Sequence, residues 1–557
     1  MAFPFLPRLF RHRSTSFGAR NDNERNRFGS TEWAQAFHLD DAGLYEQRDE
    51  SIYVGLFGGR PVYHHGPAGL SIVAGARAGK MRDVLARNLL TGTCLNSLIF
   101  LDLKGEGAFL SQNQTADGKY CAYWAPAGLQ GILPQDRINP VDYLHIESVT
   151  LVADAKVLWE NLIASSGVSQ ADYFESRGRE YGEGVTLAVA EIAGTVTLPQ
   201  LYEAISHLIA GGEPWLDIAY QMSKSRFPQV RRLEAEISEA RNDTTGGFRG
   251  IIGELAKAVA CLSDPILMAS VSPPYTMSLA DLVSSDNAWQ LYLCPPAEYV
   301  SAWAPVLKSF FVGAMLYKSR APSARRITFF LDECGQLAGG TSGGFPLVPR
   351  LFTYGAGIGI TPVAVFQSER QMATLGAEAK ALIQSSAGGK LMFALRDIES
   401  AQECSRMLGA QTLTYDDPLA QSRAEHARAN ALASLMAGGD PIQASLALSQ
   451  QGFEAEHQTK QHRQLRLPEE VMNTPSDRAY FFHEDVPYPI FLERQPYWEQ
   501  RDLAGRFHPN PYHPPMDRVQ VRTAWGMRSR DVVTEPVPER YAHYPQYRGG
   551  LWSRVEH

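Results

Sequence analysis

Residues 71–83, with the sequence SIVAGARAGKMRD, constrain the fold more than any other part of this chain. An apolar run leads into a loop of small residues, and Lys80 then opens a segment that favours a helix. This is the layout of a phosphate-binding loop, in which successive backbone N–H groups and a helix N-terminus surround an anion while a Lys adds positive charge. The alternative is an ordinary strand–turn–helix with Gly-Lys in its turn.

The usual pattern of such a loop, G-x-x-x-x-G-K-[ST], is matched only in part. Gly79 and Lys80 are in place, but Ala74 stands at the first Gly and Met81 at the Ser/Thr. The usual hydroxyl coordinates Mg²⁺, and a thioether is a poor ligand for that hard ion. Unless Asp83 or Asp102 compensates, we expect binding of nucleotide with slow or absent hydrolysis. The predicted binding loop comprises Ala74, Gly75, Ala76, Arg77, Ala78, Gly79, Lys80 and Met81.

A second apolar run ends in acid, as the partner strand of a phosphate loop does. Residues 327–331 are followed by Asp332, which would hold Mg²⁺, and by Glu333, which would polarise the attacking water. Acids at strand ends also serve solubility, which is the alternative. Gln367 closes a further apolar run, and its amide would sense the γ-phosphate or orient water, unless it only satisfies loop backbone.

The order of strand and helix patterns predicts the fold class. Strands alternate with helices from residue 70 to residue 408, which is typical of a doubly wound, mainly parallel α/β sheet. Residues 148–270 show helical periodicity alone and are expected to form an inserted all-α domain. The nucleotide-binding domain would then comprise residues 29–147 and 271–495, with 411–465 as a partly mobile insertion.

Composition predicts the character of both ends and limits the partners. Residues 1–28 are rich in Arg, Asn and Ser and are expected to be disordered, and residues 496–557 are expected to form an extended tail rich in Pro, Tyr and Arg. The net charge of −8 excludes a basic footprint over the whole chain, so any contact with a polyanion must be local or made in an assembly.

Cysteine usage and hydropathy indicate the compartment. The six Cys are scattered without a C-x-x-C, which favours buried thiols over a zinc site. No apolar stretch approaches the roughly 18 residues of a membrane helix, and the N-terminus lacks a signal-peptide core. A cytoplasmic protein is expected.

Several of these stretches together resemble the type IV secretion coupling proteins, the TraG/TraD-like conjugation ATPases. GSTEWA at 29–34 is similar to that family's G-S-A-x-W-A opening, and AGARAGK at 74–80 to its A-P-T-R-S-G-K loop. LDLKGE at 101–106 is similar to its D-x-K-G-E signature, the most specific match. The same order continues with INPVD at 138–142, LDE at 331–333 and YGAGIG at 354–359 leading into FQS at 366–368.

The resemblance implies a RecA-like motor domain that carries an all-α domain and uses ATP and Mg²⁺. Such proteins assemble as homo-hexamers at the cytoplasmic face of the inner membrane and deliver a relaxase–single-stranded DNA complex, or effector proteins, to secretion-channel components. Lys80 matches the Walker A Lys, Asp332 and Glu333 match Walker B, and Gln367 matches the motif III Gln. Arg396 loosely matches a finger position, and Arg350 is a second candidate for a charge supplied to a neighbouring subunit.

The chain departs from the family in lacking its usual N-terminal membrane helices, so we expect membrane association through a partner. Two other hypotheses stay open. One is a nucleotide-binding receptor or adaptor of the secretion machinery without turnover. The other is a DNA-pumping ATPase of the FtsK/HerA type, against which the D-x-K-G-E stretch and the helical insertion argue.

Overall fold

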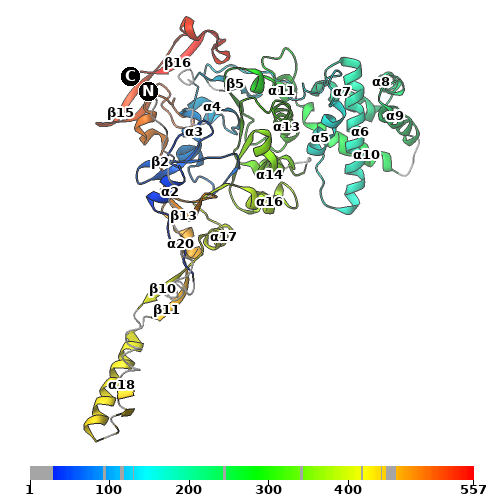
Figure 1. Ribbon diagram of the computed structural model, residues 1–557. Coiled ribbons are helices and arrows are strands. Elements are labelled where there is room, and N and C mark those ends of the chain that lie inside the picture. Colours follow the sequence, from blue (N-terminus) through cyan, green and yellow to red (C-terminus); the bar gives the residue numbers. More distant parts are fainter. Residues whose placement is uncertain are drawn as a thin grey trace, which may run out of the picture. The chain divides into compact units, whose positions relative to one another are not determined.

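The computed structural model describes residues 29–556, apart from 92–95, 113–117, 130, 242–245, 339–342, 416–417, 439, 441, 444 and 447–458. The chain forms two compact units (Figure 1). The smaller comprises Met1–Trp33 and Ala401–Val471, and the larger comprises Ala34–Ser400 and Met472–His557. The expected disordered segment 1–28 and Cys94 lie outside the described residues.

An 11-stranded sheet organises the larger unit. Seven neighbouring strands are parallel, and four antiparallel strands extend the sheet beyond β9. The order across the sheet is β2 (Arg60–His64), β1 (Ile52–Phe57), β13 (Val486–Glu493), β12 (Arg478–His483), β9 (Gly389–Phe393), β3 (Leu70–Ala74), β8 (Ile360–Phe366), β7 (Ile327–Leu331), β4 (Ser97–Leu101), β6 (Trp289–Leu293) and β5 (Tyr120–Trp124).

The central strands are short apolar segments buried on both faces. Every residue of β3, β4, β7 and β8 is buried, as expected where helices cover both faces of a parallel sheet. The carboxyl ends of parallel strands meet at one edge, where ligands of open α/β sheets bind. The predicted α/β fold class with a mainly parallel sheet is confirmed, with an added antiparallel wing.

Helices of the larger unit connect these strands. A π-helical turn, η1 (Met81–Leu85), continues directly into α3 (Ala86–Leu90) after β3. All five residues of α3 are buried, and so are 14 of the 17 residues of α13 (Ala304–Arg320). The others are α2 (Ala36–Asp41), α4 (Glu106–Leu110), α12 (Asp281–Ser284), η4 (Cys334–Ala338), α14 (Leu347–Ile358), α15 (Arg370–Thr374) and α16 (Ala379–Ser386), while α17 (Ile398–Leu408) leads into the smaller unit.

The described part of residues 151–270 consists of helices joined by short loops and contains no strand. A capping box in which Thr197 and Gln200 bond reciprocally begins α7, and α6 passes close to α5 at Gly182, against the ring of Trp159. α5 packs on α13, where Arg320 pairs with Asp154. The helices are α5 (Leu151–Leu162), α6 (Ser169–Ala193), α7 (Leu198–Ala210), α8 (Glu213–Ser223), α9 (Pro228–Ala240), α10 (Gly247–Val259), η3 (Ala260–Ser263) and α11 (Pro265–Ser270).

The smaller unit is built around a two-stranded antiparallel ribbon, β10 (Ala410–Tyr415) with β11 (Thr459–Gln464). The segment near residue 30 joins this ribbon through a bridge between Ser30 and Gln411. Between the strands lies α18 (Pro418–Met436), and α20 (Pro468–Met472) follows. Residues 411–465, expected as a partly mobile insertion, therefore carry a ribbon and a helix in their described parts.

The chain from residue 496 differs from the extended tail that its composition predicts. It forms η6 (Tyr497–Glu499), η7 (Arg501–Leu503), β14 (Arg518–Thr523), β15 (Gly526–Pro536), η8 (Glu539–Tyr541), η9 (Pro545–Tyr547) and β16 (Leu551–Val555), with β14–β15–β16 as a three-stranded sheet. Leu503 and Phe507 join Ala86, Leu90 and Leu110 in a buried cluster. A segment with few apolar residues can thus become ordered, because its few large apolar side chains pack against α3 and α4.

Two further sequence expectations concern membranes and thiols. Among the described residues, no helix combines the length and apolarity needed to cross a bilayer. Cys121, Cys294, Cys334 and Cys404 are buried, Cys261 is partly exposed, and none of these five cysteines forms a disulfide.

Candidate functional site

The loop after β3 has the backbone shape that a phosphate loop needs. Arg77 and Gly79 adopt positive φ angles of 57° and 83°, which turn the chain back toward the helix that begins at Met81. Gly75 lies so close to the end of β9 that a Cβ there would stand 2.5 Å from the Ala394 carbonyl oxygen. The small residues of the loop thus permit a close backbone approach.

Three predicted side chains converge beyond this loop. Lys80 Nζ lies 3.8 Å from Asp332 Oδ1 and 3.9 Å from Glu333 Oε1, although the acids come from β7, two strands away across the sheet. The Lys80 side chain is only 9% exposed, and its Nζ makes no hydrogen bond within the described residues. A buried ammonium without hydrogen bonds is costly unless an anion completes its shell, which fits a phosphate.

The two acids differ in setting. Glu333 has a positive φ of 51°, a backbone bend at the end of β7, and Gln336 Nε2 donates a hydrogen bond to its carboxylate. Removal from water raises the pKa of Asp332 to about 6, against the opposing effect of Lys80. A bound cation would reverse that shift, because it favours the charged carboxylate.

The aspartates that were candidates to replace the missing hydroxyl are engaged elsewhere. The Asp83 carboxylate lies 2.8 Å from Arg494 Nη1 and also accepts from Arg82. Asp102 accepts a hydrogen bond from the Ala108 backbone N–H at 2.8 Å, and burial raises its pKa to about 7. Neither geometry gives the metal a second carboxylate.

Arg494 is a site residue that the sequence analysis missed. It follows β13, and its Nη1 also donates to the Ala78 carbonyl oxygen at 2.8 Å. The guanidinium packs 4.0 Å from the ring centroid of Phe393, at the end of β9. The residue that follows the last strand of the sheet therefore contacts the loop after β3 directly. A single Arg after a strand is a common pattern, so the sequence could not predict that Arg494 contacts the loop.

Met81 has an apolar role in this structure. It packs against the buried cluster of the sheet and also against the cluster under the C-terminal segment. Met81, which occupies the Ser/Thr position of the usual pattern, thus contacts both hydrophobic clusters.

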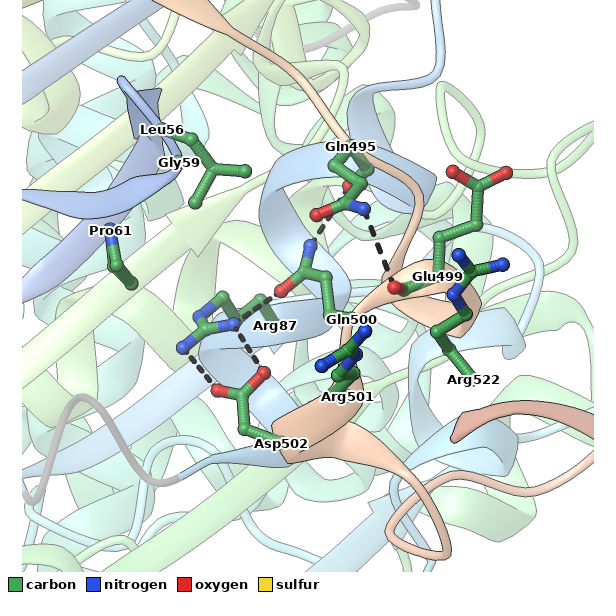
Figure 2. Close-up of a pocket in the computed structure, with 10 residues that line it drawn as sticks. All are labelled: Leu56, Gly59, Pro61, Arg87, Gln495, Glu499, Gln500, Arg501, Asp502 and Arg522. Atoms are coloured by element: carbon green, nitrogen blue, oxygen red, sulfur yellow. Dashed lines mark hydrogen bonds and ion pairs between the residues drawn. The ribbon is translucent and has the colours of Figure 1, made fainter. Parts of the chain in front are cut away.

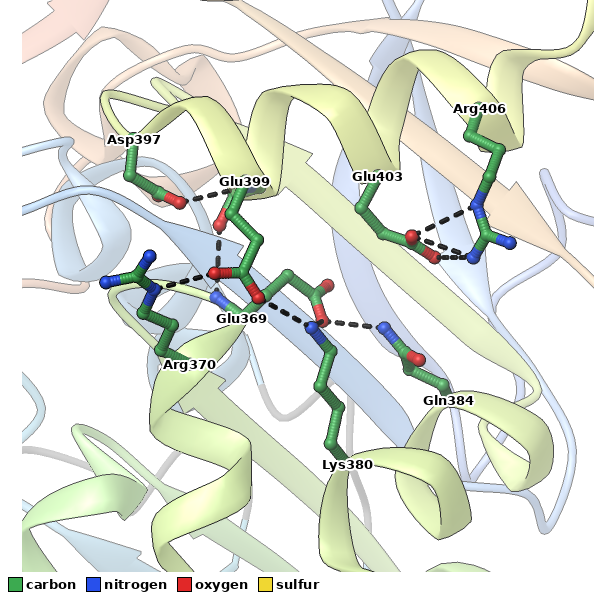
Figure 3. A network of polar contacts seen from close by, with 9 residues as sticks. Glu369, Arg370, Lys380, Gln384, Asp397, Glu399, Glu403 and Arg406 are labelled. Atoms are coloured by element: carbon green, nitrogen blue, oxygen red, sulfur yellow. Dashed lines mark hydrogen bonds and ion pairs between the residues drawn. The ribbon is translucent and has the colours of Figure 1, made fainter.

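Gln367 follows β8 directly, and β8 pairs with β3 so that Phe366 stands opposite Val73. The Gln367 backbone N–H donates to Gln371 Oε1 at 2.7 Å. Figure 3 shows what fixes the following turn: buried Glu369 accepts from Gln384 and pairs with Lys380, which also reaches Glu399. The turn that carries Gln367 is therefore anchored by a buried carboxylate.

The two arginines predicted as fingers lie in different places. Arg396 is exposed, and its Cγ would lie 3.5 Å from a Cβ on Gly75, so it flanks the phosphate loop of its own chain. Arg350 lies on α14, is exposed, and pairs with Glu160 of α5 at 3.3 Å. Only Arg396 is near the loop.

The D-x-K-G-E stretch is contacted by a segment that the sequence analysis did not connect with it. Asn510 donates a hydrogen bond to Glu106, and the Tyr512 hydroxyl donates to the Lys104 carbonyl oxygen at 2.9 Å. His508 N–H donates to the Leu110 carbonyl oxygen at 3.0 Å. The C-terminal segment therefore packs on the turn after β4, beside the strand that carries Asp332.

The residues present fit Mg²⁺ only in company with a phosphate. Among the described residues, no group of three or more His, Cys, Asp and Glu side chains is arranged to hold a metal. Mg²⁺ in nucleotide sites commonly uses one or two carboxylates together with substrate phosphates and water, and Asp332 beside Lys80 meets that requirement.

A lysine after a glycine loop, facing an Asp-Glu pair at the same edge of a parallel sheet, defines the class of RecA-like phosphate-loop proteins. Within that class, the family model for conjugative DNA transfer by the type IV secretory system matches residues 30–432. The chain belongs to this family.

Solved structures share the fold. The bacterial conjugative coupling protein TrwB, unbound and without its first 70 residues, superimposes with a TM-score of 0.58 at 14% identity, over 84% of this chain and 92% of that one. TrwB with the non-hydrolysable ATP analogue ADPNP gives 0.55, and TrwB with ADP and Mg²⁺ gives 0.56, each at 14% identity over 84% of this chain and 93% of that one. No curated protein matches the chain in a sequence comparison.

Proposed function

We propose that this chain is a coupling ATPase of type IV secretion, which binds ATP with Mg²⁺ and delivers a DNA–relaxase or protein substrate to a secretion channel. One observation carries the proposal: a buried Lys80 ammonium without hydrogen bonds stands within 4 Å of both Asp332 and Glu333. Family membership and the nucleotide complexes of the similarly folded TrwB support it.

The proposed roles follow from charge and position. Residues 74–81 would surround the phosphates with backbone N–H groups, and Lys80 would neutralise the β- and γ-phosphates. Asp332 would hold Mg²⁺, which supplies charge neutralisation when bound. Glu333 would orient and polarise the attacking water. Gln367 would contact the γ-phosphate, so that the position of the turn anchored by Glu369 would depend on the bound nucleotide. Arg396 would add positive charge beside the loop.

A second function is favoured by one feature, the apolar packing of Met81. Without the hydroxyl ligand, the protein would bind nucleotide without turning it over and would act as a substrate receptor or adaptor. Recognition would then fall to the inserted helical domain and the C-terminal segment.

The test is ATP binding and turnover by the purified chain, with and without single-stranded DNA. We expect binding of Mg-ATP by the wild type, loss of at least tenfold in affinity in Lys80→Ala, and loss of turnover with retained binding in Glu333→Gln. Lys257→Ala, an exposed change in the helical domain, is the control. If the wild type binds ATP but does not hydrolyse it with or without DNA, the receptor function is supported. If the wild type does not bind ATP at all, both functions are overturned.

We also propose a homo-hexamer at the cytoplasmic face of the inner membrane, held there by a membrane-embedded channel component. Closed rings let one subunit supply charge to its neighbour's nucleotide. Light scattering of the protein with ADPNP and Mg²⁺ tests the ring, and a mass that stays monomeric at every concentration would contradict it.

A further inference from the structure

One hairpin of this acidic chain carries four arginines within a short segment. The chain carries 52 Lys and Arg against 60 Asp and Glu, yet residues 518–530 contain four Arg and no acid, between Asp517 and Asp531. Along β14, Arg518, Gln520 and Arg522 are exposed while Val519 and Val521 are buried. Arg528 and Arg530 follow on β15, directly opposite Val521 and Val519, so they lie on the other face of the hairpin from Arg518 and Arg522. Arg518 pairs with Asp517, with Nε to Oδ1 at 3.1 Å. Within the described part of the chain, no ion pair joins Arg522, Arg528 or Arg530 to a carboxylate. A local polyanion contact is thus available.

An aromatic pocket opens at the start of this hairpin. Its volume is about 460 Å³, within the range of ligand sites in proteins. None of its lining residues is acidic, and five carry aromatic or imidazole rings: Tyr497, Trp498, Phe507, His508 and His513. Arg518 stands at its edge. A flat, apolar ring attached to a negative charge is the chemistry that this lining would accept.

A second hollow of about 470 Å³ lies at the other end of β14, where Arg522 lines it together with Arg87 and Arg501 (Figure 2). Arg87 is neutralised by Asp502, with Nη2 to Oδ2 at 2.6 Å, and Glu499 also lines the hollow. Segment 495–502 contributes to both hollows, so they flank the exposed face of β14. The distance from residue 518 to residue 522 along a strand is about 13 Å.

The turn of the hairpin exposes a tryptophan. Trp525 is 87% exposed, and Met527 beside it is also exposed. Proteins that bind single strands without sequence preference combine a positively charged path with exposed aromatic rings on which bases stack. An exposed ring next to four arginines reproduces that combination outside the aromatic pocket.

We propose that the β14–β15 hairpin and the pocket at its start form a binding surface for single-stranded DNA. Its phosphates would follow Arg518 and Arg522 on one face of the hairpin, pass the turn at Trp525, and continue along Arg528 and Arg530 on the other face. One base would stack on Trp525, and another would enter the pocket beside Arg518. This inference deepens the proposed coupling function by assigning its nucleic-acid contact to the C-terminal segment. A single strand is favoured over an anionic bilayer because the aromatic lining is recessed, where splayed bases reach and a membrane surface does not.

The experiment is binding of a fluorescein-labelled oligothymidylate to the full chain, followed by anisotropy between 50 and 200 mM salt. We expect the triple variant Arg522→Ala, Arg528→Ala, Arg530→Ala to weaken binding at least tenfold. Because each phosphate contact contributes about 0.7 to the salt slope of a single strand, the slope should fall by about 2. Trp525→Ala should weaken binding about 5- to 100-fold, whereas Trp525→Phe, which keeps a stacking ring, should retain most of it.

The controls separate this surface from the nucleotide site. Arg540→Ala, an exposed arginine of η8 outside the hairpin, should leave DNA binding unchanged. Lys80→Ala should bind the oligonucleotide as the wild type does, and the triple variant should bind Mg-ATP normally, which also verifies its fold. Wild-type DNA affinity and salt slope in the triple variant would overturn the proposal. The proposal would also be overturned if the triple variant lost binding to phosphatidylglycerol vesicles but kept its DNA binding, because the hairpin would then bind lipid.

Discussion

The guanidinium of Arg494 lies 2.8 Å from the carboxylate of Asp83, and each side chain is only 1% exposed. Asp83 belongs to the helical turn that begins at the phosphate loop, and Arg494 follows the last strand of the large sheet. Arg494 also donates to the Ala78 carbonyl oxygen within the loop. The loop after β3 is thus fixed by a charge that lies 411 residues further along the chain than Asp83. Burial lowers the pKa of Arg494 to about 10.

Removing one member of this pair should be strongly destabilising. A buried charge left without its partner costs about 3–5 kcal/mol of unfolding free energy, so Asp83→Ala should lower the urea midpoint markedly and weaken ATP binding. Glu46→Ala, which breaks an exposed pair with Arg48, should cost less than about 1 kcal/mol. Equal losses in the two variants would show that the buried pair does not hold the loop.

Restoring a hydroxyl at position 81 should strengthen the dependence of nucleotide binding on Mg²⁺. Met81→Ser supplies the missing oxygen ligand, at a cost of about 1–2 kcal/mol from lost packing. Met81→Leu keeps the packing without the oxygen and is the matched control. Calorimetric titration of ATP with and without Mg²⁺ compares the three proteins. An unchanged Mg²⁺ dependence in Met81→Ser would place the metal away from this residue.

The stability of the free protein should fall as pH rises from about 4 to about 7. Burial raises the pKa of Asp102 from 3.8 to about 7, so the folded state binds this proton more tightly than the unfolded state does. The stabilising effect is fully present below the unfolded value and is lost as pH rises through the folded value, by roughly 4 kcal/mol. Scanning calorimetry at pH 5 and pH 7.5 measures it. Asp102→Asn should flatten this dependence, and an unchanged slope would refute the assignment.

The affinity for ATP in the presence of Mg²⁺ should change with pH in the opposite direction, rising as pH rises. The pKa of Asp332 is raised to about 6, and a protonated carboxyl does not hold Mg²⁺. We therefore expect Mg²⁺-dependent ATP affinity to fall as the pH drops below about 6, with ATP binding in the absence of Mg²⁺ as the control. Asp332→Asn should bind Mg-ATP weakly at every pH. A strong pH dependence that persists in Asp332→Asn would point to another group.

Two glycines should respond to alanine with opposite signs. In Gly75→Ala the new Cβ would meet the Ala394 carbonyl oxygen at 2.5 Å, and backbone cannot yield as a side chain can. We expect lost stability and lost ATP binding. Gly357 lies within α14 with open space around its Cβ position, so Gly357→Ala should stabilise by about 0.5–1 kcal/mol. Thermal unfolding of both variants tests the contrast, and a neutral Gly75→Ala would mean that the loop tolerates the displacement.

Much of the fold follows from local patterns, because short buried strands such as 70–74 and 327–331 are bounded by clear loop signals. Those patterns also placed Lys80, Asp332 and Glu333 at strand ends, and the structure brings the three together. The sequence could not indicate Arg494, since its contact with Asp83 depends on pairing between distant strands. It also could not indicate the packing of residues 503 and 507, because two apolar side chains do not form a periodic pattern.

The antiparallel wing links the beginning of the chain to its end. Strand β1 pairs with β13, and the loop after β3 depends on Arg494, which lies 416 residues beyond Ala78. A ribosome that has synthesised Lys80 and even Asp332 has therefore not yet made the part that steadies the loop. The nascent protein should acquire nucleotide affinity only when synthesis is nearly complete, which would keep unfinished chains out of any ATP-driven assembly.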